Sequence, residues 1–444
     1  MNKFTKDTFY TVITRFARLL VNILTSVIIA RTLGPEGKGI YSIITILPGL
    51  LVSFANLGIG QATVYYIGQK KYPLKEILNT NIFFSLIISL FTIFIGSTII
   101  FFFSNSLFPF APKILLFSAL LLVPLQIFFN FIVEIFLGLQ KIKKYNFINL
   151  ASQLSFLILI VLFFLFFHLN IKDLIITEAI SLFIINIFLY FDLKKETDNI
   201  PPSINKSFLK DSLSFGAKSY LGYLFNSLGQ YINVFLMNIF LNPAAIGFYS
   251  IAYAATEKLS YLVQSPAMVL FPKISAENNE NNRRHFTPLI CRTILFTITP
   301  LILILFFFSK FIISFLYSNV FLEAVGPLKI LLLGTLVIGV SRTIGNDILG
   351  RGKPMITTYI TIIAFIVLTA LNILWIPRFG ITGAAWAVTI SYIINFLLKI
   401  IIYSKISGNK FRDIFLPHKE DFVIYKQILL SGLNYFKKYD KTKK

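Results

Sequence analysis

The chain is poor in the residues from which metal centres, disulfides and most catalytic sites are built. Its single cysteine, Cys291, excludes an internal disulfide. Its three histidines lie far apart and show no metal-ligand spacing. Charged residues make up only 14% of the 444 positions, whereas globular domains carry about 25%. We therefore expect no metal site and no bound cofactor, and the low charge argues against a soluble domain.

The chain is instead rich in long apolar segments. Hydrophobic residues make up 56% of it, and apolar runs of about 20 residues recur along its length. Such runs predict an all-α integral membrane protein. Arg15 and Arg18 interrupt the first run, so we interpret it as the first span and not as a cleavable signal peptide. We expect about twelve spans, at 8–30, 40–66, 76–103, 113–138, 146–167, 172–192, 212–240, 246–271, 285–307, 322–349, 356–376 and 380–403.

The basic residues are distributed unevenly between the two sides of the membrane. The net charge is +22, which in a soluble protein would suggest a nucleic-acid partner, but the charge lies mostly in loops between spans. If the N-terminus is cytoplasmic, 27 lysines and arginines fall in inner segments and six in outer ones. The positive-inside rule then predicts a multi-pass cell-membrane protein with both termini in the cytoplasm. No nucleic-acid partner is expected.

An eleven-residue turn occurs twice. Residues 33–43 and 241–251 share the pattern L-x-P-x-x-x-G-[IF]-Y-S-I, 208 residues apart. Six predicted spans separate the copies, and an even number means that both halves enter the membrane in the same direction. We therefore predict two parallel repeats, with both turns on the outer face.

The predicted domain organisation follows from this repeat. Residues 1–193 form an N-terminal six-helix lobe, 194–211 a cytoplasmic inter-lobe loop, and 212–403 a C-terminal six-helix lobe, around a central cavity. Residues 404–444 form a basic cytoplasmic tail. Apolar residues at helical spacing in this tail fit either an interfacial helix on the anionic inner leaflet or a loosely ordered segment.

Polar residues follow one face of the first and seventh predicted spans, at spacings of three or four residues. In the first span these are Thr11, Arg15, Arg18, Asn22 and Ser26. In the seventh they are Lys218, Gly222, Asn226, Gln230 and Asn233. A shift of 208 residues places Arg18 on Asn226 and Asn22 on Gln230. We therefore expect both stripes to face one central cleft.

Three further cations, Lys258, Arg292 and Arg342, lie within predicted spans. A charge at mid-bilayer costs about 2.5–3.5 kcal/mol on insertion scales, so such residues usually face a cavity or a partner. Nearly all of these cations lie at mid-depth or in the cytoplasmic half, which predicts a cationic cavity open to the cytoplasmic leaflet. The alternative is that basic side chains snorkel to the headgroups, as we expect for Lys329 and Lys399 near helix ends.

Four carboxylates, Glu134, Glu178, Glu257 and Asp347, also lie within predicted spans. A buried carboxylate can carry a coupled proton or sodium ion, or it can neutralise a neighbouring cation. We favour neutralisation for Asp347, with Arg342 as its partner. Glu257 adjoins Lys258, but neighbours on a helix point about 100° apart and need not pair.

Several segments resemble the polysaccharide flippases of the Wzx type, whose superfamily also contains multidrug exporters and the lipid II flippase. The resemblance covers about residues 5–405. It rests on ARTLGPEGKGIY at 30–41, GFYS at 247–250, LFPKIS at 270–275 and IPRFGITGAA at 376–385. It implies a V-shaped pair of six-helix lobes that moves an undecaprenyl-diphosphate-linked glycan to the outer leaflet by alternating access. It also implies a role in O-antigen, capsule or similar polysaccharide biosynthesis, beside membrane lipids and polysaccharide-assembly proteins.

The resemblance suggests roles for the polar residues by type and depth, without a fixed motif. Several cations in a low-dielectric cleft would offset the desolvation of an anionic diphosphate. On this interpretation Arg15, Arg18 and Lys218 contact the diphosphate. Lys258, Arg292 and Arg342 line the route. Asn22, Asn226 and Gln230 meet sugar hydroxyls.

Two other functions fit the same chain less well. An ion-coupled multidrug exporter of the same superfamily would share the fold, but cationic drugs call for cavity carboxylates, and cations prevail in these spans. A membrane glycosyltransferase or polysaccharide polymerase would need a sizeable outer catalytic loop. The longest outer loop expected here is about 309–321, without a carboxylate or histidine cluster. We therefore predict a transporter and not an enzyme.

Overall fold

The computed structural model describes residues 3–166, 170–194, 204–276, 280–416 and 421–422, and all regular structure within them is helical. In chain order the helices are α1 (Lys3–Ala55), α2 (Ile59–Gln69), α3 (Leu74–Leu107), α4 (Lys113–Leu120), α5 (Leu122–Gly138), α6 (Ile142–Phe166), α7 (Ile171–Lys194), α8 (Lys206–Phe240), α9 (Pro243–Ala276), α10 (Glu280–Phe307), α11 (Ser309–Tyr317), the 3-10 helix η1 (Asn319–Ala324), α12 (Val325–Gly350), α13 (Pro354–Ser407) and α14 (Phe411–Phe415).

Eight helical segments of the described chain are long and apolar enough to cross a membrane, which confirms the predicted all-α integral membrane protein. The two longest, Ile13–Gln69 and Pro354–Ser407, each contain two of the predicted spans. The break in α1 falls at Gly34 (φ 67°) and that in α13 at Gly380 (φ 57°). Both values of φ are in the left-handed region, which glycine adopts at little cost.

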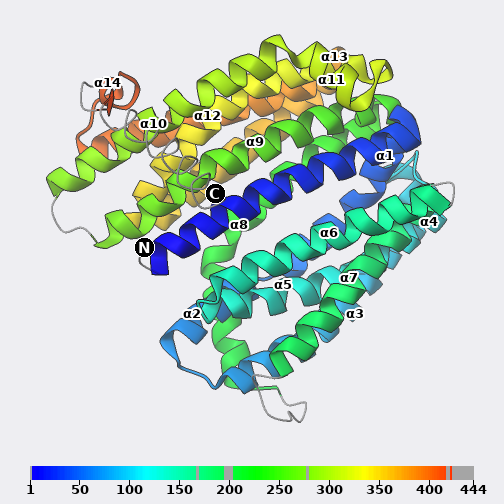
Figure 1. Ribbon diagram of the computed structural model, residues 1–444, viewed down its shortest axis with the longest axis horizontal. Coiled ribbons are helices and arrows are strands. Elements are labelled where there is room, and N and C mark those ends of the chain that lie inside the picture. The colour runs from blue at the N-terminus through cyan, green and yellow to red at the C-terminus, as the bar shows by residue number, and fades with distance from the viewer. Residues whose placement is uncertain (1–2, 167–169, 195–203, 277–279, 417–420, 423–444) are drawn as a thin grey trace, which may run out of the picture.

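Figure 1 shows helices α2–α7 on one side of the molecule and α9–α13 on the other, with α1 and α8 between them. We refer to these sides as the N-terminal group (α2–α7) and the C-terminal group (α9–α13). Helix α1 contacts both α6 and α9, and α8 contacts both α2 and α13. The two central helices therefore connect the groups.

The repeated turns pack directly against each other. An ideal Cβ atom placed on Gly39 would lie 1.7 Å from the carbonyl oxygen of Pro243. One placed on Gly247 would lie 2.0 Å from the carbonyl oxygen of Pro35. The contact is reciprocal, as between subunits related by a twofold axis. The glycine of each copy is required because the backbone of the other copy occupies the space of a side chain.

The second half of α1 lies along α8. An ideal Cβ on Gly49 would lie 2.4 Å from the ring of Tyr231, so the ring packs against bare backbone. One helical turn further along α1, the hydroxyl oxygens of Ser53 and Ser227 are 2.6 Å apart and share a hydrogen bond. The central helices are thus in close contact over several turns.

An ion pair and a hydrogen bond connect the N-terminal group to the end of α8 that we predict to be cytoplasmic. The ammonium of Lys71 lies 2.6 Å from Oδ2 of Asp211, and the hydroxyl of Tyr72 donates to the same oxygen at 2.6 Å. These two hydrogen bonds hold the pKa of Asp211 below its ordinary value, and the bond from Lys71 has the larger effect. The predicted interfacial helix of the tail lies outside the described residues.

Candidate functional site

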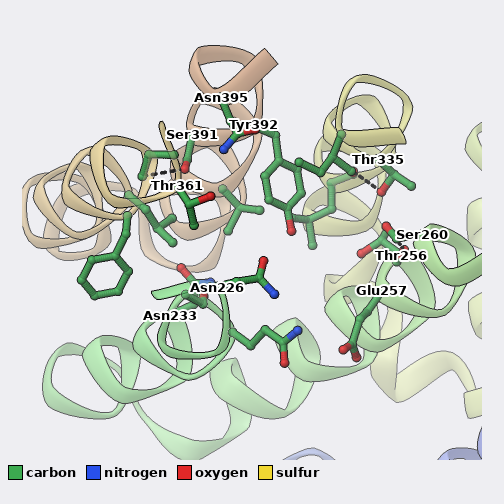
Figure 2. A pocket seen from close by; sticks show the side chains of 18 of the residues that line it. Asn226, Asn233, Thr256, Glu257, Ser260, Thr335, Thr361, Ser391, Tyr392 and Asn395 are labelled. Carbon is green, nitrogen blue, oxygen red and sulfur yellow. Dashed lines mark hydrogen bonds between the residues drawn. The ribbon is translucent and has the colours of Figure 1, made fainter. Parts of the chain in front are cut away.

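A polar cavity of about 120 Å³ lies between α8, α9, α12 and α13. It has room for several water molecules or a small ion. Figure 2 shows its labelled side chains converging from these four helices on a common space. The polar and charged lining residues are Asn226, Gln230, Asn233, Tyr253, Thr256, Glu257, Ser260, Thr335, Arg342, Thr361, Ser391, Tyr392, Asn395 and Lys399.

The polar stripe of the seventh predicted span forms one wall of this cavity. Asn226, Gln230 and Asn233 all line it, as their spacing on one helical face requires. Asn372 of α13 donates to Oδ1 of Asn233 at 2.6 Å, and both residues are buried. This hydrogen bond positions α8 against the first half of α13. Lys218 lies on the same helix, about two to four turns before these residues.

The stripe of the first span packs elsewhere. Asn22 donates to the side-chain oxygen of Gln153 on α6 at 3.0 Å, and Arg18 donates to the same oxygen at 3.4 Å. Half-buried Arg15 lies one turn before Arg18 on the same face. None of these residues lines the described cavity, which only the stripe of the seventh span faces; that both stripes face one central cleft stays a prediction. A shift of 208 places Gln153 on Thr361, so each stripe meets the equivalent helix of its own half.

Two of the predicted coupling carboxylates lie in the N-terminal group. Glu178 accepts a hydrogen bond from the hydroxyl of Tyr41 at 3.0 Å. Glu134 on α5 packs over Gly60, where an ideal Cβ would lie 3.1 Å from Cγ of Glu134. Tyr41 belongs to the first copy of the repeated turn. This hydrogen bond therefore connects the turn of α1 to a half-buried carboxylate of α7.

The third carboxylate, Glu257, lines the cavity beside a cation. Its Oε2 lies 3.7 Å from the ammonium of Lys258. The two neighbours therefore form an ion pair, although their positions on the helix did not require it. The pair places Lys258 at the edge of the cavity and offsets the charge of Glu257.

The predicted pairing of Asp347 with Arg342 is wrong. Asp347 is fully buried and accepts hydrogen bonds from Thr287 and from Arg351. Arg351 follows Asp347 by four residues and lies on the same helical face, whereas Arg342 precedes it by five and lies roughly 140° away. Arg351 also contacts Glu280 at 2.6 Å. Asp347 is therefore part of a buried ion-pair network.

Arg292 likewise forms an ion pair within the fold. Its guanidinium donates to both carboxylate oxygens of Asp421, at 2.6 and 2.9 Å, and to the backbone carbonyl of Asp413. Arg292 is 5% exposed and Asp421 is 1% exposed. A bidentate pair of this kind positions the end of the described chain against α10. The structure thus places Arg292 outside the described cavity, away from the route proposed for it.

One wall of the cavity consists of residues that the sequence patterns did not predict to bind substrate. Ser391, Asn395 and Lys399 of α13 all line the cavity, and they recur every four residues on one helical face. This spacing was the available signal. Lys399 was expected to snorkel to the headgroups, but it is 7% exposed and faces the cavity.

Comparison with known proteins identifies the family. The family model described as polysaccharide biosynthesis protein matches residues 4–277, which is more than half of the chain. The chain belongs to this family. This result confirms the resemblance inferred from the repeated turns.

A curated relative is the probable low-salt glycan biosynthesis flippase Agl15 of Haloferax volcanii, 26% identical over 221 residues. That match covers 48% of this chain and 46% of the relative, and the chain spans less than half the length of the curated relatives it matches.

Solved structures show the same fold over nearly the whole chain. The lipid II flippase MurJ, in an inward closed conformation, has a TM-score of 0.74 at 19% identity, with 97% of each chain covered. A multidrug resistance MATE family transporter of the MOP superfamily, in an inward-facing conformation, has a TM-score of 0.69 at 15% identity. That comparison covers 90% of this chain and 99% of the transporter. The fold of this family member is therefore that of these membrane transporters.

Proposed function

We propose that this polysaccharide biosynthesis family protein is a flippase. It moves an undecaprenyl-diphosphate-linked oligosaccharide from the cytoplasmic to the outer leaflet by alternating access. A polar cavity carries the proposal: it lies between α8, α9 and two helices, α12 and α13, that belong to segments long and apolar enough to cross a membrane. Its amides and hydroxyls suit sugar hydroxyls, which apolar helix faces cannot satisfy, and the cavity widens during alternating access to admit the whole oligosaccharide. Similarity to a lipid II flippase fold and to a glycan biosynthesis flippase supports this substrate class.

The polar residues divide into two roles in this proposal. Arg15, Arg18 and Lys218 bind the diphosphate, because paired cations in a low-dielectric site compensate for its lost hydration. Asn22 from the first stripe, with Asn226 and Gln230 from the cavity, contacts sugar hydroxyls. Arg342 and Lys258 line the path of the anionic headgroup, and the prenyl chain stays in the lipid.

Alternating access requires close contacts that can separate. The contact between the repeated turns, at Gly39 and Gly247, is van der Waals packing of backbone on backbone. It can open without leaving a polar group unsatisfied. We propose that it separates when the cavity opens outward, and that Glu134, Glu178 or Glu257 carries a coupled proton or sodium ion.

The test is transport of a fluorescent prenyl-diphosphate glycan in vesicles. The double variant Arg18→Ala and Lys218→Ala should reduce translocation at least tenfold, as expected for the loss of two charge-assisted contacts worth about 1.5–3 kcal/mol each. The matched control removes two exposed lysines far from the stripes, Lys113→Ala and Lys405→Ala, and should leave transport unchanged. Equal transport by both double variants would contradict the assignment.

A multidrug exporter is the second candidate, because the fold is also that of a MATE family transporter and Glu257 lines the cavity. An exporter of organic cations would depend on that carboxylate. The same vesicles loaded with a cationic dye distinguish the two functions. Dye export that is abolished by Glu257→Gln, without glycan transport, would assign the exporter. Glycan transport without dye export supports the flippase.

A further inference from the structure

The α12–α13 side of the cavity holds two cations whose charge no described carboxylate offsets. Arg342 and Lys399 both line the cavity, and no ion pair is described for either. Within the part of the chain that the structure describes, the only carboxylate lining the cavity is that of Glu257, which lies 3.7 Å from the ammonium of Lys258. The Nη1 atom of Arg342 is buried, and none of the described residues forms a hydrogen bond with it. A buried donor of this kind usually marks a ligand or ordered solvent.

The backbone of α12 creates the space for the lysine. An ideal Cβ on Gly345 would lie 3.2 Å from Nζ of Lys399 and 3.4 Å from its Cε. The absence of a side chain at Gly345 therefore lets the ammonium lie against α12. Gly345 follows Arg342 by three residues, so the ammonium of Lys399 lies against the same face of α12 that carries Arg342. Two like charges that line one low-dielectric cavity repel each other.

A third donor comes from Asn395, one turn before Lys399 on α13. Its Oδ1 accepts a hydrogen bond from the hydroxyl of Ser341 at 2.7 Å. This bond fixes the orientation of the amide and leaves its NH2 group for the cavity, which Asn395 lines and toward which it points in Figure 2. The guanidinium, the ammonium and the amide are all donors. Such a set suits an anion and disfavours a metal cation.

We propose that Arg342, Lys399 and Asn395 form a binding site for a single small anionic group. The cavity of about 120 Å³ matches a small ion with a few waters and is too small for a whole oligosaccharide. A dissolved inorganic anion or one acidic substituent of the transported glycan can supply this chemistry. The second source rests on the proposed function, whereas the site itself does not.

The test is ligand-dependent thermal stability of the purified full-length protein in nanodiscs, with unfolding reported by a dye that reacts with the buried Cys291. A ligand that binds only the folded state raises the melting temperature with its concentration. Chloride is titrated on the wild-type and Lys399→Met proteins in parallel, so that the variant controls for ionic strength, and methyl glucuronide is compared with uncharged methyl glucoside. We expect chloride or methyl glucuronide to stabilise the wild-type protein, and methyl glucoside to do so at least tenfold more weakly.

Lys399→Met should raise the concentration required for half-maximal stabilisation at least tenfold, as for the loss of one charge-assisted hydrogen bond. Lys405→Met removes an exposed lysine of the same helix and should have no effect. If Lys399→Met does not fold, Asn395→Ala should weaken binding and Lys399→Arg should retain it. Stabilisation by chloride alone assigns a dissolved ion, and stabilisation by glucuronide at lower concentration assigns the substrate.

Stabilisation of the Lys399→Met and wild-type proteins at equal concentrations would overturn the site, as would the absence of any anion effect. Neither result depends on transport. Glycan transport without anion binding at this site would contradict the site but not the proposed function. Anion binding without glycan transport would support the site and contradict the proposed function.

Discussion

The contact between the repeated turns gives the sharpest prediction for stability. In Gly39→Ala the new methyl group would start 1.7 Å from the carbonyl oxygen of Pro243, and in Gly247→Ala it would start 2.0 Å from that of Pro35. Real Cβ atoms do not approach other heavy atoms more closely than 3.0 Å. Both obstacles are backbone, so the turns must move apart by about 1 Å. Overpacking of this kind costs about 1–3 kcal/mol.

The expected change in melting temperature follows from chain length. Unfolding entropies of about 2.1 cal/mol/K per residue make 1–3 kcal/mol equivalent to about 1–3 °C for 444 residues. The buried thiol of Cys291, the only cysteine in the chain, reports unfolding to a thiol-reactive dye. The matched control is Gly68→Ala, because that glycine lies inside a helix with no atom within 4 Å of an added Cβ. It should be neutral or stabilising by up to about 1 kcal/mol.

The two turn variants should also couple. Once the turns have separated to fit one methyl group, the second meets less resistance. The double variant should therefore be more stable than additivity predicts, by about 0.5 kcal/mol or more. A Gly39→Ala protein as stable as Gly68→Ala would refute the close contact. Strict additivity would show that the two glycines do not share one interface.

Two further predictions concern carboxylates. Asp347→Asn removes one of the two carboxylates that Arg351 contacts and leaves it Glu280, so we expect the loss of one charge-assisted hydrogen bond, about 1.5–3 kcal/mol in unfolding free energy, measured with the same dye. The second concerns Asp211, whose pKa is lowered by Lys71 and Tyr72. Its stabilising contribution is present above the ordinary carboxyl pKa of about 3.9 and is lost as pH falls through the lower folded value. Acid titration should therefore destabilise wild type through a step that Asp211→Asn lacks, and identical profiles would contradict this.

Patterns local to one helix predicted the structure well. The stripe of Asn226, Gln230 and Asn233 forms a cavity wall because spacing alone fixes which residues share a face. The repeated turns coincide with the glycine break in α1 and with the start of α9, because proline and glycine determine local backbone geometry.

Contacts between helices distant in the sequence could not be predicted in this way. The fate of Lys399 depends on the missing side chain of Gly345, on a helix about 50 residues earlier in the chain. Arg292 was assigned to a transport route because its partner, Asp421, lies 129 residues away. Basic residues in apolar helices look alike in sequence, whether they pair within the fold or face a cavity. Only tertiary packing distinguishes the two cases.

The 208-residue repeat preserves the sequence of the turn but not the charge at equivalent positions. The shift of 208 residues that superimposes the turns also places Arg342 on Glu134, so equivalent positions carry opposite charges. In the C-terminal half this cation lines the polar cavity beside Lys399 and Asn395, whereas in the N-terminal half the carboxylate packs over Gly60 on α2. A site that favours an anion cannot also favour a cation at the equivalent atoms. If each half binds a ligand during transport, the two ligands must therefore differ in charge, and exchanging Glu134 and Arg342 should not preserve either site.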